Sequence, residues 1–545
     1  MSPRRVARDL LPLPHFLHSK ASYGNSRSAL QARGKDAAVV RVANEAVDGL
    51  NFLWGARSPS SMEPSVAQQF CMQDILDGVR GDPPPPDLSS PKAALAELLG
   101  SQSSAYSSEG LSCVADYSLD LVSWPTSAGN VDLLSVLEGE DRECCANISK
   151  YLSTDTAGGD SAESPPPYWD STLRSDRSAY VSFARQLLSR NMVSIRRSCS
   201  RRVGIFFVKK KNGKIRIVID ARVVNRDLPR PPRTRLASTA AVVELRFEDG
   251  ETASFSAQDI ADCFYQFRIP ENMQELFGLK PIRAQELGIS HLDGVPIAGG
   301  TWLELCLSVL PMGFSFALHW TQQGHRCLLR RAGVGGIQHE MLDKAPPPSL
   351  SAKEPARLVY VDNQLFASVR TGASSRARRQ VHKYFSNLAG GALPLHDIED
   401  EVSVTEQIGL ELDGVRGIAR LSLRRRWRLR QALQGILDTP FLSGKQLEII
   451  LGHVVHALML NRPAVAVLRA CYDYIQRKYF CPGRLWKSVQ REIRATLGLL
   501  QFAKVDWRLP WHATVSVADA STTGYACLEA SCAIKDVAAI GAWSD

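Results

Sequence analysis

Residues 203–225, VGIFFVKKKNGKIRIVIDARVVN, constrain the fold more than any other stretch of the chain. Two runs rich in β-branched and aromatic residues flank Asn212-Gly213, and an Asn-Gly pair between such runs is the strongest short signal for a β-hairpin. The predicted hairpin carries a cluster of basic side chains at its tip: Lys209, Lys210, Lys211, Lys214 and Arg216. A stiff basic tip is suited to gripping phosphates, although a solvated surface hairpin has the same composition.

The charge of the 545-residue chain is unevenly distributed. Residues 1–165 hold 13 basic and 21 acidic side chains, whereas the remainder holds 52 and 35. The basic remainder favours a polyanion as partner. Twelve cysteines without a C-x-x-C pair indicate reduced thiols, hence an intracellular protein of the nucleus or cytoplasm that is not secreted. No apolar stretch has the length of a membrane span, so no membrane association is expected.

The acidic N-terminal part contains low-complexity segments at 82–91, 101–110 and 154–167. Segments of this kind bury too little apolar surface to offset chain entropy. We therefore expect 1–165 to be a partly disordered arm with short helices, one of them beginning at Pro91. Because the arm is acidic, we expect its removal to tighten the binding of nucleic acid.

Two later strands are predicted to end in acidic residues. The stretch 253–270 carries Asp259, and 358-LVYVDNQLFAS-368 indicates a hairpin with Asp362 and Asn363 at its tip. A surface turn would explain the second stretch, but a carboxylate at the end of a buried strand is costly unless it is paired or binds a metal. Between them, a Pro-Met-Gly turn allows close backbone approach at Gly313.

In this order the elements resemble the palm and fingers of a reverse transcriptase of the long-terminal-repeat and DIRS-like retrotransposon type. The resemblance covers roughly 170–500 and rests on five motifs, at Phe207–Asn225, Asp259–Phe264, Leu310–Gly313, Tyr360–Asn363 and Gly409–Gly414. It implies an α+β right-hand polymerase fold with an antiparallel sheet. Fingers and palm would span 166–420 and a helical thumb or connection 421–510. Residues 511–545, with Asp519, would be an incomplete RNase H-like start without RNase H activity.

The resemblance also implies an activity, namely RNA-directed DNA polymerisation. The protein would add dNTPs to a primer 3′-hydroxyl on an RNA or DNA template, using two Mg²⁺ ions, with Mn²⁺ as a possible substitute. Asp259, Asp362 and Asn363 would be the catalytic and metal-binding residues. The nucleotide site would comprise Lys210, Lys211, Arg216, Phe264, Met312 and Gly313.

Template and primer would be held by a further set of residues, again implied by the resemblance: Arg222, Asn225, Tyr360, Gly409, Asp413, Gly414, Arg424, Arg426 and Trp427. The members of this set at 424–427 belong to an arginine-rich helix that would follow the duplex backbone. A solvated helix face explains the arginines equally well.

The chain departs from the family pattern at several positions. Asn363 stands where the family has a second aspartate, Met312 where Gln or Phe is more common, and residues 332–356 form an insert. An amide oxygen still ligates a metal but carries no charge, which predicts a working but weakened polymerase. Two alternatives stay open, a catalytically decayed retroelement remnant that binds nucleic acid and a structural adaptor that uses the acidic arm.

Overall fold

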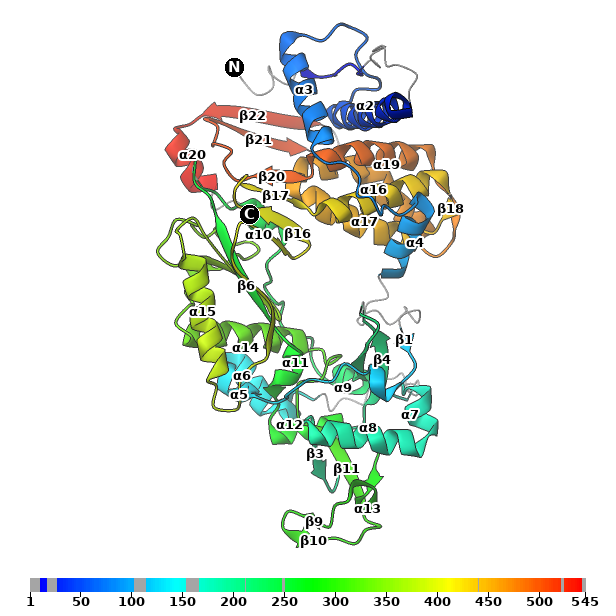
Figure 1. Cartoon of the computed structure of the whole chain (residues 1–545), viewed down its shortest axis with the longest axis vertical. Helices are drawn as coiled ribbons and strands as arrows, with labels where there is room; N and C mark the ends of the chain where they lie inside the picture. Colours follow the sequence, from blue (N-terminus) through cyan, green and yellow to red (C-terminus); the bar gives the residue numbers. More distant parts are fainter. Residues whose placement is uncertain are drawn as a thin grey trace.

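The computed structural model describes residues 10–16, 27–101, 114–152, 166–210, 212–247, 250–439, 441–520 and 524–541. It combines helices with sheets that are almost entirely antiparallel, as expected for an α+β chain. Figure 1 shows an elongated molecule in which a central sheet connects two ends. The helices of 27–101 and 423–499 lie at one end, the lysine-rich hairpin lies on the other side of the gap, and the short strands β9 (His291–Leu292) and β10 (Val295–Pro296) form the opposite end.

The central sheet has the strand order β12 (Ala356–Tyr360), β13 (Asn363–Ser368), β6 (Ser254–Ile260) and β14 (Leu395–Val402). All three pairings are antiparallel. Helices α14 (Ala317–Arg331) and α15 (Ala373–Ser386) pack against it. This sheet brings strands that are far apart in sequence side by side.

The basic hairpin consists of β4 (Gly204–Lys209) and β5 (Ile215–Asp220), which confirms the hairpin predicted around Asn212-Gly213. Strand β1 (Val114–Ala115) pairs with its outer edge. Helix α8 (Arg177–Ser189) covers one face, where Phe183 meets Phe207 edge to face at 5.8 Å. The apolar side of the hairpin is thereby buried while its basic tip stays exposed.

A second sheet follows, with the order β15 (Val404–Gln407), β16 (Leu410–Asp413), β17 (Ile418–Leu421) and β20 (Lys504–Asp506). The C-terminal helices pack beside it: α16 (Leu423–Asp438), α17 (Gly444–Leu458), η6 (Met459–Leu468), α18 (Arg469–Lys478) and α19 (Lys487–Leu499). The start of α17 is fixed by a capping box of Ser443 and Gln446, as the sequence predicts.

The sequence analysis expected no stretch with the length of a membrane span, but one helical stretch meets that criterion. Gly444–Lys478 is long and apolar enough to cross a bilayer by length and composition, and 39% of its most apolar window is buried inside the protein. The stretch is interrupted at Asn461, whose φ of −142° and ψ of 74° are not helical, and it contains Pro463. One such helix is weak evidence for a span, because core helices of soluble proteins meet the same criterion.

The N-terminal segment, defined here as residues 27–101, is packed against the C-terminal helices. It forms α2 (Arg27–Trp54), α3 (Val66–Arg80) and α4 (Pro91–Ser101), so the helix predicted to begin at Pro91 is confirmed. Helix α2 lies against α19 and α4 against α16. Of the low-complexity segments predicted at 82–91, 101–110 and 154–167, the structure describes the first, whereas 102–110 and 154–165 lie outside the described residues.

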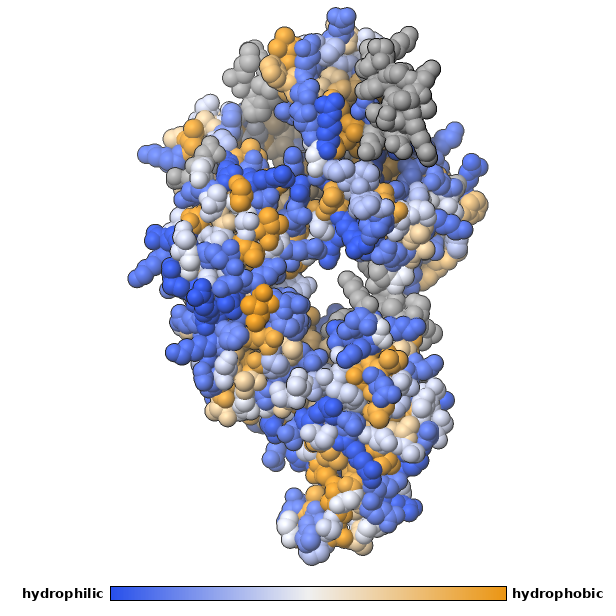
Figure 2. Space-filling view, in the orientation of Figure 1, coloured by the Kyte–Doolittle hydropathy of each residue, from blue (hydrophilic) through white to orange (hydrophobic). Residues whose placement is uncertain are grey.

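At the C-terminus, β21 (Thr514–Ala520) and β22 (Tyr525–Ser531) form a two-stranded hairpin, followed by α20 (Ile534–Gly541). Asp519 lies opposite Ala526 in this hairpin. The relation to an RNase H domain stays a prediction. Figure 2 shows that hydrophilic residues dominate the visible face of the molecule, with hydrophobic residues in small scattered groups, and that an open gap separates its two ends.

Candidate active site

Four side chains form a row across the central sheet. Tyr360 is paired with Asn363, Asn363 with Asp259, and Asp259 with His396, so each strand contributes one residue. Residues directly opposite each other in antiparallel strands project from the same face. The register therefore gathers an aromatic ring, an amide, a carboxylate and an imidazole on one face of the sheet.

The turn of the β12–β13 hairpin lies one residue earlier than the sequence predicts. Its two connecting residues are Val361 and Asp362, and Asn363 is the first residue of β13. The expectation that Asn363 occupies the tip was therefore wrong. Asn363 instead donates a hydrogen bond from Nδ2 to Asp362 Oδ1 at 3.0 Å, so the amide supports the carboxylate beside it.

Asp362 lies beside the end of β6, the strand that carries Asp259. The backbone N–H of Ile260 donates to the carbonyl oxygen of Asp362 at 3.0 Å, which ties the turn to the end of β6. Burial raises the pKa of Asp259 to about 6, and the charge of Asp362 is the next largest cause. Two carboxylates that repel each other in this way form a site that a cation would stabilise.

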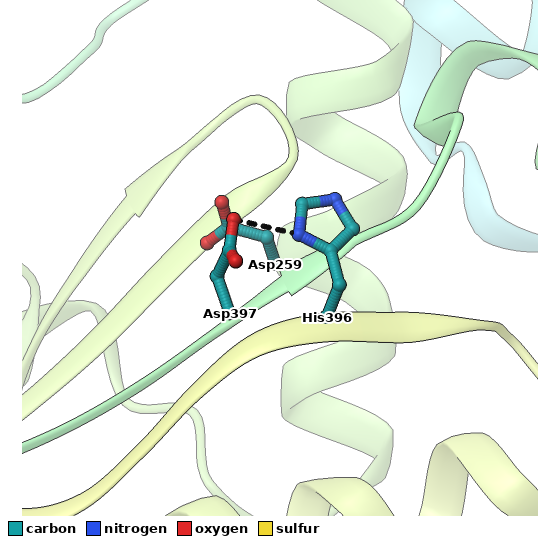
Figure 3. Close-up of side chains that lie close together, drawn as sticks. All are labelled: Asp259, His396 and Asp397. Carbon is teal, nitrogen blue, oxygen red and sulfur yellow. Dashed lines mark hydrogen bonds and ion pairs between the residues drawn. The ribbon is translucent and has the colours of Figure 1, made fainter. Parts of the chain in front are cut away.

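Two further ligand groups, His396 and Asp397, were not singled out from the sequence. One ligand atom from each of Asp259, His396 and Asp397 lies within 4.8 Å of the others (Figure 3). Neighbouring residues of a regular strand point to opposite faces, but β14 has a register shift after His396, and Asp397 has a φ of +49°. A bulge of this kind re-aims side chains. The only sequence signal was the acid-rich run 396-HDIEDE-401.

The basic hairpin approaches this acidic face through Asp262. Burial raises the pKa of Asp262, and the charges of Lys210 and Arg216 act in the opposite direction, which shows that both cations are near it. Lys210 also donates from Nζ to Ser123 Oγ at 2.7 Å. Lys211 lies outside the described residues. Two of the cations predicted to bind a triphosphate therefore adjoin the acidic end of the sheet.

The Pro-Met-Gly turn packs directly on the basic hairpin. Gly313 has a φ of +116°, and a Cβ atom there would lie 2.1 Å from the carbonyl oxygen of Ile219. The carbonyl oxygen of Met312 accepts from the N–H of Ile219 at 2.8 Å. The close approach predicted at Gly313 is thus confirmed. Phe264, from α11 (Cys263–Gln266), and Gly313 together line a cavity of about 330 Å³.

Comparisons with known proteins give only distant similarities. No family model matches the sequence, and neither does any curated protein. Two solved structures of a foamy viral protease-reverse transcriptase with double-stranded DNA are similar at 16% identity, with TM-scores of 0.45 and 0.44. Each similarity covers 72% of this chain, and 66% and 75% of the respective viral chains. The similar part thus spans just under two thirds of the first viral chain. A likeness this distant assigns no activity.

Two residues predicted to touch the template have structural partners. Asn225 donates from Nδ2 to the carbonyl oxygen of Gly313 at 2.9 Å, and its Oδ1 accepts from the N–H of Ser315 at 2.9 Å. Asn225 therefore holds the Pro-Met-Gly turn, and its predicted template contact stays a prediction. Arg222 pairs with Asp220 at 2.6 Å, although 58% of its side chain is exposed.

The predicted primer hairpin divides into exposed and buried parts. Tyr360 lines a cavity of about 900 Å³ together with Ile408, His456 and Arg462. Gly409, with a φ of +84°, adjoins this cavity in the β15–β16 turn, where an added Cβ would lie 3.4 Å from His456 Nε2. The cavity is bounded by the end of β12, by the β15–β16 turn and by α17 and η6.

Asp413 and Gly414 serve the fold instead of facing the cavity. Asp413 is 8% exposed, and its carboxylate accepts from the N–H groups of Val415 and Arg416. A Cβ atom on Gly414 would lie 2.0 Å from the carbonyl oxygen of Ala253. The prediction that these two residues contact the primer is corrected accordingly, because the turn itself uses them.

The arginine-rich helix α16 faces the N-terminal segment. Arg426 pairs with Asp82 at 2.8 Å, Trp427 donates from Nε1 to the Asp82 carbonyl oxygen at 3.2 Å, and Arg424 pairs with Asp87. Arg426 is buried, so its predicted duplex contact was wrong, whereas Trp427 is half-buried and its contact stays a prediction. Arg424 keeps 78% of its side chain exposed. The sequence could not show that acidic residues far upstream neutralise this helix.

The pKa of Asp259 leads to a test by pH. A folded-state pKa raised from 3.8 to about 6 means that the ionised carboxylate destabilises the metal-free protein above pH 6, and that this penalty disappears as pH falls towards 4. Asp259→Asn should therefore stabilise the metal-free protein at pH 7 by about 1–2 kcal/mol, after allowance for solvent screening. Thermal unfolding between pH 4 and pH 8 measures this. A gain that is independent of pH would contradict it.

Proposed function

We propose that this protein is an RNA-directed DNA polymerase of retrotransposon origin, which adds dNTPs to a primer 3′-hydroxyl. The observation that carries the proposal is the convergence of Asp259 and Asp362 at the end of adjacent strands, next to the basic hairpin. The central sheet is the proposed palm and the basic hairpin the proposed fingers, within 166–420. The C-terminal helices, within 421–510, are the proposed thumb or connection.

The donor set at the end of the sheet fits divalent cations. Asp259 and Asp362 supply carboxylates, and Asn363 supplies an amide oxygen without charge. His396 and Asp397 adjoin Asp259 and would compensate for the missing carboxylate at position 363 if an ion binds there. Mg²⁺ is the expected ion, and the imidazole makes Mn²⁺ an effective substitute. Bound ions would activate the primer 3′-oxygen and stabilise the leaving pyrophosphate.

The remaining residues of the site bind and select the nucleotide. Lys210 and Arg216 would hold the triphosphate, which is supported by the effect of both charges on Asp262 at the acidic end of the sheet. The Phe264 ring would lie beneath the sugar and leave no room for a 2′-hydroxyl, which favours dNTPs over NTPs. The 900 Å³ cavity beside Tyr360 is the proposed position of the primer end.

Primer extension on an RNA template with the full chain tests this function. Asn363→Asp should raise the extension rate most at low Mg²⁺, because the added charge strengthens metal binding. We expect a gain of about tenfold at low Mg²⁺ that shrinks at saturation. Replacing Mg²⁺ with Mn²⁺ should also raise the extension rate of the natural protein, but less than Asn363→Asp does. Asn147→Asp, the same chemical change at the end of α6 (Gly139–Ala146), is the matched control.

A decayed remnant that only binds nucleic acid is the second candidate, and Asn363 is the observation that favours it. If the natural protein and the Asn363→Asp variant are equally inert in Mg²⁺ and Mn²⁺ while nucleic acid still binds, the remnant replaces the polymerase. If both are active with the same metal dependence, Asn363 is not a ligand.

A further inference from the structure

The residue before Asp362 has an unusual backbone conformation. Val361 has a φ of +57° and is 7% exposed. A β-branched residue rarely adopts this left-handed conformation, because its side chain crowds the backbone. A strained residue in a folded protein persists only where its surroundings hold it in place. The two-residue turn that carries Asp362 therefore depends on external support.

Helix α14 supplies this support through two fully buried side chains. Gln322 Oε1 accepts from the N–H of Val361 at 2.7 Å, and Gln322 Nε2 donates to the carbonyl oxygen of Val359 at 3.0 Å. His325 Nδ1 lies 2.8 Å from the carbonyl oxygen of Val361, which only accepts, so Nδ1 carries the proton. Both polar backbone groups of Val361 are thus bound by side chains three positions apart on one helix.

We propose that Gln322 and His325 are positioning residues that hold Val361 in its left-handed conformation and thereby aim the Asp362 carboxylate at Asp259. The inference rests on the proposed metal-binding role of Asp362. Without the two side chains, the N–H and carbonyl of Val361 would be buried without partners. The turn would then relax towards an ordinary φ, and the Asp362 carboxylate would rotate away from Asp259.

The strain itself provides the test, because glycine adopts a positive φ without cost. Mn²⁺ binding to the full chain is measured by the loss of the free Mn²⁺ electron paramagnetic resonance signal. Gln322→Leu should weaken Mn²⁺ binding about tenfold, as expected when a group that orients a metal ligand is removed. In a Val361→Gly background the same substitution should cost much less, about threefold or below. Gln323→Leu, on the same helix and half-buried, is the control.

His325 allows a rescue experiment. Asparagine places an amide N–H near the position of Nδ1–H, whereas leucine has no donor. We expect the His325→Asn variant to keep most of the Mn²⁺ affinity and the His325→Leu variant to lose about tenfold. A purely structural role would be filled better by leucine in this buried position, so equal losses in the two variants would overturn the assignment.

The outcomes separate this inference from the proposed function. Wild-type Mn²⁺ affinity in the Gln322→Leu variant, or an equal loss in the natural and the Val361→Gly backgrounds, overturns the positioning role. If Asp362→Asn leaves Mn²⁺ binding unchanged, the proposed metal site fails instead. In that case the positioning role is tested by urea unfolding midpoints, which do not depend on a metal. If Gln322 holds the turn, Gln322→Leu should destabilise the natural protein more than it destabilises the Val361→Gly variant.

Discussion

Replacing Asp362 with asparagine should reduce primer extension by roughly a thousandfold. Metal stabilisation of a transition state contributes several kcal/mol, and each 1.36 kcal/mol is a factor of ten in rate. The natural protein already has an amide at position 363. Of the three predicted metal-binding residues Asp259, Asp362 and Asn363, the variant would therefore keep a carboxylate only at Asp259. Asp397 and His396 adjoin Asp259 and would help it to hold one ion, but no second carboxylate of the motif set would remain for the other ion.

The measurement is the extension rate on a primed RNA template, together with nucleic acid binding at fixed salt. Asp362→Asn should leave binding of the primed template nearly unchanged, because phosphates are bound by cations elsewhere. Asp438→Asn, at the end of α16, is a control for the loss of one negative charge. Full activity of the Asp362→Asn variant would remove Asp362 from the mechanism.

Replacing Asp82 with alanine should destabilise the protein by about 3–5 kcal/mol, the cost of leaving a buried charge without its partner. The Asp82 carboxylate pairs with Arg420 at 3.1 Å and with Arg426 at 2.8 Å, and only 8% of the Arg426 side chain is exposed. The N-terminal segment that carries Asp82 cannot easily separate from the helices. A Cβ on Gly435 would lie 2.5 Å from the carbonyl oxygen of Pro91, and one on Gly498 would lie 1.8 Å from that of Glu45.

A matched control for this effect lies five residues along the chain. Asp87→Ala also removes a carboxylate from an arginine of α16, but Arg424 is 78% exposed, so the expected loss is below about 1 kcal/mol. Thermal unfolding of both variants compares the two effects. If Asp82→Ala unfolds like the natural protein and binds nucleic acid more tightly, the N-terminal segment is not needed for stability, and the predicted effect of removing the acidic arm 1–165 is supported instead.

Local chemistry made several elements predictable. The Asn212-Gly213 pair specified the basic hairpin, Ser443 specified the start of α17, and Gly313 specified a close backbone approach. Each of these depends on residues within a few positions of one another. The expectation that Asp259 and Asp362 belong to one site followed from ordered motifs of a known resemblance and not from local chemistry.

Long-range contacts decided what the sequence could not show. Polar turn chemistry favoured Asp362-Asn363 as the turn, but Gln322 and His325 support Val361 in the first turn position instead. The bulge that brings Asp397 to Asp259 depends on the pairing of β14 with β6. None of these partners lies near its target in sequence, and hydrophobic periodicity carries no information about them.

The pairing of β1 with β4 bears on how this polypeptide can be divided for experiments. A fragment beginning at residue 166 would lack β1, which covers the edge of β4, and would also lack α2 and α4, which cover α19 and α16. Uncovered strand edges and apolar helix faces promote aggregation. An inactive preparation of such a fragment would therefore reflect a missing scaffold, and truncation mapping should begin upstream of α2, at a position before Arg27.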